Sequence, residues 1–421
     1  YWLQVISLGF SYSLKKRKTD ASYSAYHSNN SLAMMNNYFK IALRNFQKQK
    51  LFSTINIIGL ALGMSICLLA LSISVAIIQS DGFHEKKDRI YQINTYFKNS
   101  QDTKTYGSTF PALGDYMEGE YPFIETGLTI HSGFQPVVNQ NGNDLDFHGY
   151  FVDPEFFDVF SFDLLKGNPQ TALSQPNTMV LTEAVAKKLF REVDPMGKVL
   201  KTESGDFTVT GVMPDLKQTH LYFQVLTSTY TYERNQPATS KESDWTTYKN
   251  HYLYVLLRPG TSKETLSNAL TQASLKASAY HPHQIIELES VILDEAVPRW
   301  NISNALGIGL DYPSMLFFLF IGLLILLPAI FNYTNLSIAR AIKRSKEIGI
   351  RKVVGAAKHQ VKMQFIVETV VMMMLALAGS FVIFVYIQQE FLDVVAAAEV
   401  LETSIRPSLV IVFILFGLII G

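Results

Sequence analysis

Residues 51–80 read LFSTINIIGLALGMSICLLALSISVAIIQS, which is 30 residues without Asp, Glu, Lys or Arg. Residues 312–339, 369–389 and 407–421 are equally free of charged side chains. A bilayer core of about 30 Å needs about 20 apolar helical residues, so the first three stretches can span it. The fourth is shorter and resembles a spanning helix that is cut short. A buried helix of a soluble protein is the alternative, although such helices rarely stay uncharged for so long. We therefore predict an α-helical membrane protein with four transmembrane helices, the last truncated.

The composition excludes several other classes of protein. The 421 residues are 48% hydrophobic with a mean hydropathy of +0.13, and they include one Cys, Cys67. A single Cys excludes a disulfide framework and a Cys-rich zinc site. Lys and Arg together number 36, and so do Asp and Glu. The chain therefore lacks the basic surplus of a typical nucleic-acid-binding protein, and no nucleic-acid partner is expected.

The charges are unevenly distributed along the chain, and this predicts its orientation. Residues 35–50 carry four basic and no acidic side chains, and residues 340–362 carry eight basic and one acidic. Residues 390–406 carry four acidic and one basic, and residues 81–311 carry 29 acidic and 19 basic. Because short loops rich in Lys and Arg stay in the cytoplasm, the two basic segments are predicted to be cytoplasmic. The two acidic segments are then external.

These patterns divide the chain into consecutive segments, with a large mixed α/β domain inserted between helices 1 and 2. In order they are a segment of non-native or disordered character (residues 1–33), a cytoplasmic amphipathic helix (35–50), transmembrane helix 1 (51–80), the external domain (81–311), transmembrane helix 2 (312–339), a cytoplasmic coupling segment (340–362), transmembrane helix 3 (363–389), an external loop (390–406) and the truncated transmembrane helix 4 (407–421).

The first 33 residues differ from the rest of the chain. They begin with Tyr1, contain a KKRK cluster at residues 15–18, and continue into a Ser-, Tyr- and Asn-rich stretch before Met34 and Met35. The apolar piece ahead of the cluster is too short to span a membrane, and no cleavage pattern follows it. We interpret this segment as translated upstream sequence or the tail of another protein; a disordered cytoplasmic tail is the alternative. The apolar run at the other end suggests that the chain is incomplete there as well.

Two sequence features predict contacts, one for the segment before the first membrane helix and one for the helix itself. Residues 35–50 place apolar and basic side chains on different helical faces, which suits a helix lying on membrane lipid at the inner leaflet. The solvated start of the first span is the simpler alternative. Within the span, Gly59 and Gly63 form a GxxxG pair, whose small residues permit a second helix to approach closely. This pair is our predicted helix-packing site.

The external block has the periodicities of a mixed α/β domain. Residues 141 and 142 form an Asn-Gly pair between two strand-like runs, which is a hairpin signal. A second hairpin is predicted at Ser204-Gly205, within residues 199–212. Further strands are predicted at residues 89–97 and 252–257, and helices at residues 111–119, 181–190 with a Thr182 cap, and 262–279 with a cap near Thr261.

Several motifs in this order resemble a known family. Residues 337–369, SIARAIKRSKEIGIRKVVGAAKHQVKMQFIVET, resemble the signature of the FtsX-like ABC-transporter permeases. The external block is similar to the MacB-type periplasmic core domain at residues 164–167 with Ala172-Leu173, 178–189 (TMVLTEAVAKKL), 194–197 (DPMG) and 207–212 (FTVTGV). The start of the first span and HEKKDRIYQI after it also fit, most closely to permeases of the Bacteroidetes group. One departure is Phe190-Arg191, where Phe-Gly is usual, and it puts one turn in doubt. The resemblance covers about residues 35–421, with the FtsX-like permease domain at about 312–421, and the chain has the character of a fragment.

The resemblance implies a location, partners and a mechanism. It implies a multi-pass protein of the bacterial inner membrane whose large domain lies in the periplasm. The implied partners are a cytoplasmic ABC ATPase subunit, a second permease copy or homologous half, and a membrane-fusion or other periplasmic protein. ATP-driven motion of the ATPase would then drive export or extraction of a peptide, antibiotic, lipoprotein or lipid. The alternative is an FtsX-like mechanical relay that regulates an external partner, such as a cell-wall hydrolase, without transport.

The resemblance also assigns the contact with the ATPase to the segment between the second and third spans. The predicted coupling residues are Lys343, Arg344, Glu347, Ile348, Gly349, Ile350, Arg351, Lys352 and Gly355. The basic side chains could engage a partner surface or anionic lipid, and the apolar ones could pack in a groove. The alternative is that the basic run serves only to set the topology.

No residue pattern in the chain indicates an enzyme. The phosphate loop G-x-x-x-x-G-K-[ST] is missing, so ATP should be bound by the partner, and no cofactor or metal is expected in this chain. His281 and His283 have the wrong spacing for a helical metal pair, and an exposed loop is the favoured interpretation. Glu368 lies just inside the third span, and an acidic residue within a membrane span is a candidate functional residue. Snorkelling or pairing with Lys362 explains it equally well.

Overall fold

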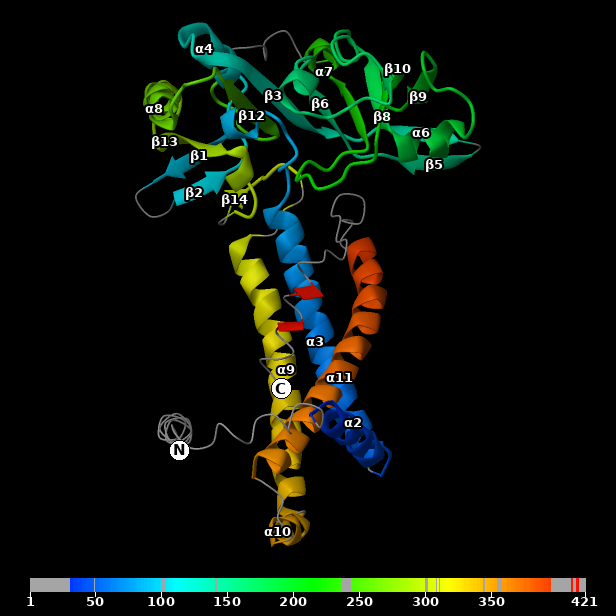
Figure 1. Cartoon of the computed structure of the whole chain (residues 1–421). Helices are drawn as coiled ribbons and strands as arrows, with labels where there is room; N and C mark the ends of the chain where they lie inside the picture. The colour runs from blue at the N-terminus through cyan, green and yellow to red at the C-terminus, as the bar shows by residue number, and fades with distance from the viewer. Residues whose placement is uncertain are drawn as a thin grey trace. The chain divides into compact units, whose positions relative to one another are not determined.

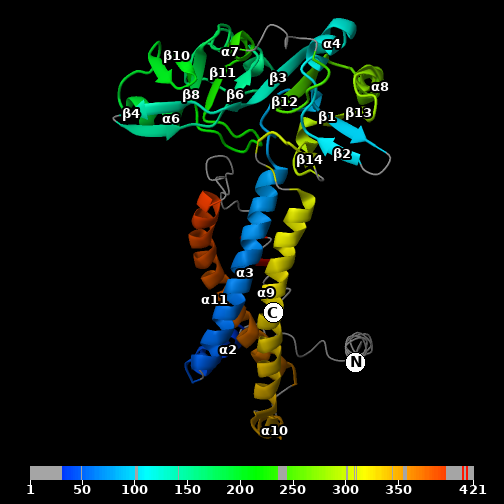
Figure 2. The ribbon, with the colours of Figure 1, turned by 180° about the vertical axis from the view of Figure 1, so that it is seen from behind.

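The structure is a computed structural model, shown in Figure 1 and from behind in Figure 2. It describes residues 31–48, 50–99, 103–140, 142–235, 244–299, 302–307, 309, 311–343, 345–353, 358–394, 410–411 and 414–415. The chain divides into two compact units. One comprises Tyr1–Ser65, Leu323–Ile383 and Val410–Gly421, and the other comprises Ile66–Gly322 and Phe384–Leu409.

Long apolar helices dominate the first unit. The helices are α2 (Ser31–Lys48), α3 (Lys50–Ile78), α9 (Tyr312–Lys343), α10 (Ser345–Val353) and α11 (Lys358–Val394). Three of them, α3, α9 and α11, continue into the second unit. Within the described residues, three segments are long and apolar enough to cross a membrane: Ser53–Ile78, Tyr312–Ala339 and Lys362–Gln388. The prediction of long apolar helices flanking a large α/β domain is confirmed for these three. The predicted fourth helix, at residues 407–421, lies largely outside the described residues. Helix α2 begins at Ser31, so it also includes three residues of the segment set apart as 1–33.

Small residues bring α3 and α9 close together within the first unit. A Cβ added at Gly63 would lie 2.9 Å from Cδ1 and 3.0 Å from Cα of Leu326. A Cβ added at Gly59 would lie 3.7 Å from that of Ala329. The structure thus places the GxxxG pair against a helix of the same chain, where a larger side chain at residue 63 would push the helices apart.

Polar and apolar contacts join the remaining helices of this unit. The Asn332 amide donates to Oδ1 of Asn56 at 2.7 Å, and the Tyr333 hydroxyl donates to that of Thr369 at 2.8 Å. Buried residues of α2 and α11 form one apolar cluster, to which Ala42 and Phe46 contribute from α2. Because lipid cannot replace hydrogen bonds between helices, such contacts help to set which faces meet.

The second unit contains a mixed sheet, to which fourteen strands of the described residues contribute (Figures 1 and 2). The strands are β1 (Ile90–Lys98), β2 (Thr103–Tyr106), β3 (Ile124–Phe134), β4 (Val137–Gln140), β5 (Asn143–Asp146), β6 (Gly149–Val152), β7 (Lys166–Gly167), β8 (Thr178–Thr182), β9 (Val199–Thr202), β10 (Gly205–Met213), β11 (Val225–Ser228), β12 (His251–Leu257), β13 (Ile285–Ile292) and β14 (Ile302–Ser303). Their order is β14-β2-β1-β12-β3-β6-β11-β8-β10-β9-β4-β5, with β13 beside β1 and β7 beside β10.

Both predicted hairpins are present in this sheet. Strands β4 and β5 pair antiparallel on either side of Gly142, and β9 and β10 pair with Thr202 opposite Gly205. Asn141 lies outside the described residues. Among the described strands three pairs are parallel: β8 with β10, β6 with β11 and β2 with β14. The domain is therefore mixed α/β, as the alternating periodicities predicted.

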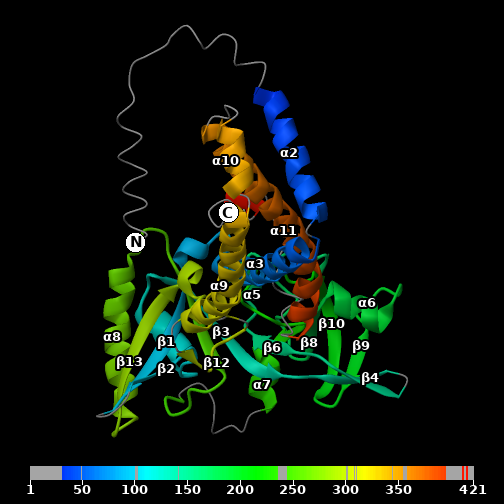
Figure 3. The same ribbon diagram turned by 90° about the horizontal axis from the view of Figure 1, so that it is seen from below.

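Helices cover the sheet in two regions, and each covers an apolar cluster. The helices are α4 (Leu113–Glu120), α5 (Phe156–Val159), α6 (Glu183–Phe190), α7 (Thr229–Asn235) and α8 (Lys263–Ala279), with short 3-10 helices η1 (Lys87–Arg89) and η3 (Leu293–Glu295). Helices α4 and α8 pack over β1, β12 and β13, and α6 packs over β8 and β10. Figure 3 shows α8 and α6 at opposite ends of the domain. A further cluster between them contains eight buried aromatic rings.

The starts of α6 and α8 can be compared with their predicted caps. Thr182 occupies the N-cap position of α6, as predicted, but its side chain makes no capping hydrogen bond; the residue is also the last of strand β8. Instead, Oδ1 of Asp215 accepts from the Ala184 amide at 2.8 Å. At α8 the cap is Ser262, one residue after the expected Thr261, and its Oγ accepts from the Thr265 amide at 3.2 Å.

Arg191, which stands where the family usually has glycine, lies at the C-terminal end of helix α6. Arg191 has φ +54° and ψ −113°, and its amide donates to the carbonyl of Lys187 at 2.9 Å. Glycine adopts such a backbone conformation without steric cost, whereas a side chain with a Cβ is strained there. The turn is therefore formed despite the arginine.

Replacing Arg191 by Gly should stabilise the external domain by about 1 kcal/mol, because the strain at positive φ is removed. The change is measured as a higher melting temperature of the purified chain in detergent. Lys188→Gly, in the interior of the same helix, is the matched control and should cost about 1 kcal/mol. A lower melting temperature for Arg191→Gly would contradict this account of the turn.

Candidate functional site

The chain leaves the first apolar helix through a short, buried segment of the second unit. Helix α3 ends at Ile78, and three residues later Asp81 is fully buried with φ +63°. Asp is among the residues that tolerate this backbone conformation. The Asp81 amide donates to the carbonyl of Gln218 at 2.7 Å, and the Ser80 hydroxyl donates to the carbonyl of Ala76 at 3.2 Å. The helix end is thus tied to a distant part of the chain.

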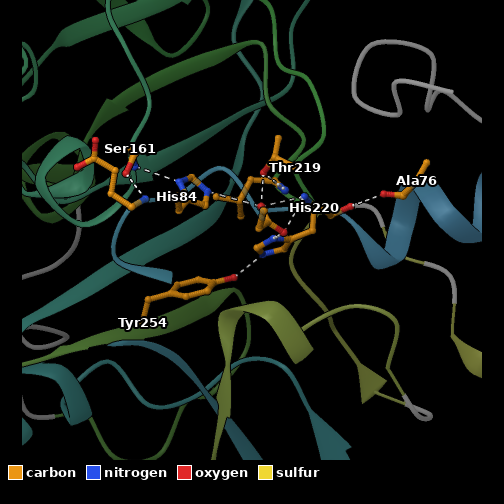
Figure 4. A network of polar contacts seen from close by, with 10 residues as sticks. Ala76, His84, Ser161, Thr219, His220 and Tyr254 are labelled. Carbon is orange, nitrogen blue, oxygen red and sulfur yellow. Dashed lines mark hydrogen bonds and ion pairs between the residues drawn. The ribbon is translucent and has the colours of Figure 1, made fainter. Parts of the chain in front are cut away.

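The Asp81 carboxylate is the centre of a polar network, shown in Figure 4. Its Oδ1 accepts from the Thr219 hydroxyl at 2.7 Å, and its Oδ2 lies 2.6 Å from Nδ1 of His220. The His220 amide is 3.3 Å from both carboxylate oxygens. Nε2 of His220 lies 2.8 Å from the hydroxyl of Tyr254, on β12. Because an ionised carboxylate can only accept, His220 carries its proton on Nδ1.

His84 completes the network on the other side of Asp81. Its Nδ1 accepts from the Ser161 amide at 3.0 Å, so the ring proton lies on Nε2. Nε2 lies 3.6 Å from Oδ1 of Asp81, and both side chains are fully buried. The Ser161 hydroxyl in turn accepts from the Glu85 amide at 2.9 Å. The segment after the helix is therefore held on both sides.

These contacts keep the Asp81 carboxyl ionised at neutral pH. Burial alone would raise its pKa, but the charge of His220, hydrogen bonds from His220 and Thr219, and the nearby Nε2 of His84 hold the pKa well below its usual range. Burial lowers the pKa of His84. A carboxyl with a depressed pKa stabilises the fold above its unfolded pKa of about 3.9, and this stability is lost as the pH falls toward the folded pKa. The lowered pKa of His84 has the opposite consequence: below its unfolded pKa of about 6.5 the unfolded chain takes up a proton that the folded chain does not, so moderate acidification should weaken the network first through His84.

The chain enters the second apolar helix beside the same loop. A Cβ added at Gly307, which has φ +71°, would lie 2.8 Å from the carbonyl carbon of His220 and closer still to its oxygen. Next to it, Leu306 is buried with Leu221 in the domain core, and its carbonyl accepts from Nη2 of Arg299 at 3.0 Å. The Tyr312 amide, at the start of α9, donates to the carbonyl of Arg299 at 3.0 Å. Only glycine fits this close backbone approach.

Both connections therefore contact one loop, residues 214–224 between β10 and β11, which we call the anchor loop. Asp81 binds it through Thr219 and His220, and Gly307 packs on His220. Strands β10 and β11 each pair with β8 in the interior of the sheet. The anchor loop thus connects both helix ends to the interior of the sheet.

The predicted coupling residues fall on and around a different element, α10. Lys343 is the last residue of α9, and Arg344 and Gly355 lie outside the described residues. The other six belong to α10: Glu347, Ile348, Gly349, Ile350, Arg351 and Lys352. Gly349 has no neighbour within 4 Å of an added Cβ, and Ile350 is 59% exposed. The apolar side chains of Val353, 88% exposed, and Ile342, 68% exposed, are also uncovered.

The remaining candidates take ordinary structural positions. His281 lies in a loop as expected, but its Nε2 is 2.8 Å from the carbonyl oxygen of Trp245, so it is partly buried. Glu368 is buried in α11, whereas Lys362 is exposed. Across the part of the chain that the structure describes, no group of three His, Cys, Asp or Glu residues could hold a metal ion.

Sequence reasoning missed the anchor loop and its partners. Asp81 and His220 are 139 residues apart, and no local pattern links them. The available signal was weak: an Asp and a His within four residues after the first span, in a segment that otherwise resembled the family. Gly307 likewise carries no signal beyond being a glycine near a helix start.

Comparison with known families agrees with this architecture. Residues 53–273 match the model of the MacB-like periplasmic core domain, and residues 319–421 match the model of the FtsX-like permease C-terminal region. The first match covers more than half of the chain. The chain therefore belongs to the MacB-like, FtsX-type family of ABC-transporter permeases.

Individual relatives are distant. A Bacillus subtilis (strain 168) protein named uncharacterized ABC transporter permease YvrN is 24% identical over 239 residues, and the match covers 53% of each chain. The chain thus spans about half the length of this curated relative. A domain of a putative permease protein from Porphyromonas gingivalis is 19% identical with a TM-score of 0.44, covering 55% of this chain and 98% of that one. The periplasmic region of MacB from Actinobacillus actinomycetemcomitans is 15% identical with a TM-score of 0.35, covering 48% of this chain and 89% of that one.

The contact between Gly307 and His220 gives a prediction with a matched control. Gly307→Ala should destabilise the external domain by about 3 kcal/mol or more, because the methyl group overlaps the backbone of the anchor loop. Gly197→Ala is the control, since Gly197 has the same φ of +71° and nothing within 4 Å of an added Cβ. It should cost only about 1 kcal/mol. Thermal melting of the two variants in detergent measures the difference, and equal losses would refute the close contact.

Proposed function

We propose that this chain is the permease subunit that couples ATP hydrolysis by a separate cytoplasmic ATPase to movement of its external domain. The observation that carries the proposal is the convergence of both membrane connections on the anchor loop. A domain that served only as an anchor or binding module would need no more than a flexible tether at each connection. Here each connection is buried and fixed by hydrogen bonds or backbone packing.

We call the contacts of Asp81 and Gly307 with the anchor loop the junction. Its physical properties suit the transmission of force from the helices to the sheet. Hydrogen bonds to an ionised carboxylate are stronger than neutral ones, and a buried network resists deformation because each lost bond leaves an unpaired polar group. The anchor loop continues directly into β10 and β11. A shift of the α3 end would therefore move the sheet as a body rather than bend a linker.

Helix α10 is the proposed contact with the ATPase. It carries exposed apolar side chains on a segment that is otherwise basic, and such a mixture suits docking of a helix into a partner's groove. The surplus of Lys and Arg supports a cytoplasmic location for this segment. Membrane lipid and a second permease copy or homologous half are further proposed partners.

We further propose export or extraction of a substrate as the outcome of this motion. The large external domain with its MacB-like match supports this, and the charge distribution supports a bacterial inner membrane protein with that domain in the periplasm. A relay that regulates an external enzyme would use the same junction. The two would differ in whether a substrate moves when ATP is hydrolysed.

Substitution in α10 tests the coupling contact. Ile350→Asp should weaken association with the ATPase at least about tenfold, because a charge buried at the contact costs roughly 1–3 kcal/mol. Co-purification of the ATPase, at equal membrane levels of the permease, measures the effect. Leu275→Asp is the control, since Leu275 is similarly exposed, at 64%, but lies on α8 of the external domain. Full association of Ile350→Asp with the ATPase would contradict the assignment of α10 as the ATPase contact.

A further inference from the structure

The external domain has a cavity that the junction does not use. Its volume is about 550 Å³, within the range of about 300–1,000 Å³ that is typical of small-molecule sites. Its walls come from α4, β3, α7, β12 and the segment before β12. Figures 1 and 2 show α4 and α7 on the side of the domain opposite the end of α3. None of the junction residues lines it.

Two histidines form part of the cavity wall. His131 on β3 and His251 on β12 are directly opposite each other in the antiparallel pair. Their ring centroids are 4.3 Å apart with the planes nearly perpendicular, and the Tyr232 ring lies 3.8 Å from that of His131. His131 is only 9% exposed. Three aromatic rings thus contact one another in the wall of a polar cavity.

Each histidine has one buried ring nitrogen that the described residues leave unpaired. In both rings this nitrogen is Nδ1. Burial lowers the pKa of His131 to about 4 and that of His251 to about 3, so both rings are neutral at physiological pH. A neutral imidazole has one nitrogen without a hydrogen, which can accept a hydrogen bond from a bound donor. Leaving a buried polar group unpaired destabilises a fold, and a structural role alone does not account for retaining two such groups side by side.

The remaining wall is predominantly acidic. Four carboxyl groups line the cavity against a single lysine: Asp115, Asp153, Glu233 and Asp244 against Lys249. Asp153 is held in place, because Oδ2 accepts from the Thr129 amide and Oδ1 from the Thr229 hydroxyl, each at 2.6 Å. Burial raises the pKa of Asp153 to about 7, and a cation bound beside it would favour its ionised form.

We propose that this cavity binds a small organic cation, a primary amine or polyamine. Its ammonium N–H groups would donate to the carboxylates and to the neutral imidazoles, and its carbon chain would lie along Tyr232. An anion is disfavoured by the carboxylates. A metal ion is disfavoured because no group of three ligating side chains is assembled among the described residues.

The test is calorimetric titration of the full chain in lipid nanodiscs with spermidine, at about pH 8, above the pKa of Asp153. We expect saturable binding of spermidine and none of citrate. The double variant Asp115→Asn/Glu233→Gln should bind spermidine at least about tenfold more weakly. The double variant Glu120→Gln/Glu203→Gln removes the same charge from exposed positions outside the cavity and should bind like the unmodified chain.

Three results would overturn the proposal. The first is a lack of saturable spermidine binding, and the second is an equal loss in both double variants, which would indicate a general charge effect. The third is binding of ZnCl2 without binding of spermidine. Because no ATPase takes part in the titration, these results bear on the cavity and not on the coupling function.

Discussion

The buried carboxylate of Asp81 is the interaction on which the rest of the structure depends. Taking an ion out of water costs several kcal/mol unless other groups replace its hydration. Here Thr219, the backbone and side chain of His220, and His84 surround it. The compensation works only while the end of α3 stays seated on the anchor loop. The charge therefore makes one relative position of the helix end and the sheet much more favourable than its neighbours.

The helices and hairpins could be predicted because their signals are local. The 30 uncharged residues from 51 to 80 are sufficient for a membrane helix whatever surrounds them, and the alternation around Gly142 and Gly205 is sufficient for hairpins. Arg191 and Thr182 show the limit of local rules. Burial of α6 against β8 and β10 forces an arginine into a backbone conformation suited to glycine. The Ala184 amide meanwhile finds its acceptor in Asp215, 31 residues away.

The functional features could not be predicted because tertiary contacts create them. Asp81 and His220 meet only when the sheet is assembled, as do His131 and His251, which depend on the register of β3 with β12. The family resemblance pointed to the segment around α10, whose chemistry is readable in sequence as basic and apolar residues side by side. The resemblance contained no indication of how motion would pass from the membrane helices to the domain. That path depends on contacts between three segments that are distant in the chain, those containing Asp81, residues 214–224 and Gly307.

Hydrogen exchange of the permease in complex with its ATPase tests this account most directly, with and without a trapped nucleotide. In the unmodified chain, trapping should change the exchange of backbone amides in both α10 and the strands β10 and β11. In Asp81→Asn, which keeps a residue tolerant of positive φ, the response of α10 should persist and that of β10 and β11 should disappear. Glu287→Gln, which loses the exposed ion pair with Lys98 on strands away from the anchor loop, should behave like the unmodified chain. An unchanged response of β10 and β11 in Asp81→Asn would contradict transmission through the anchor loop.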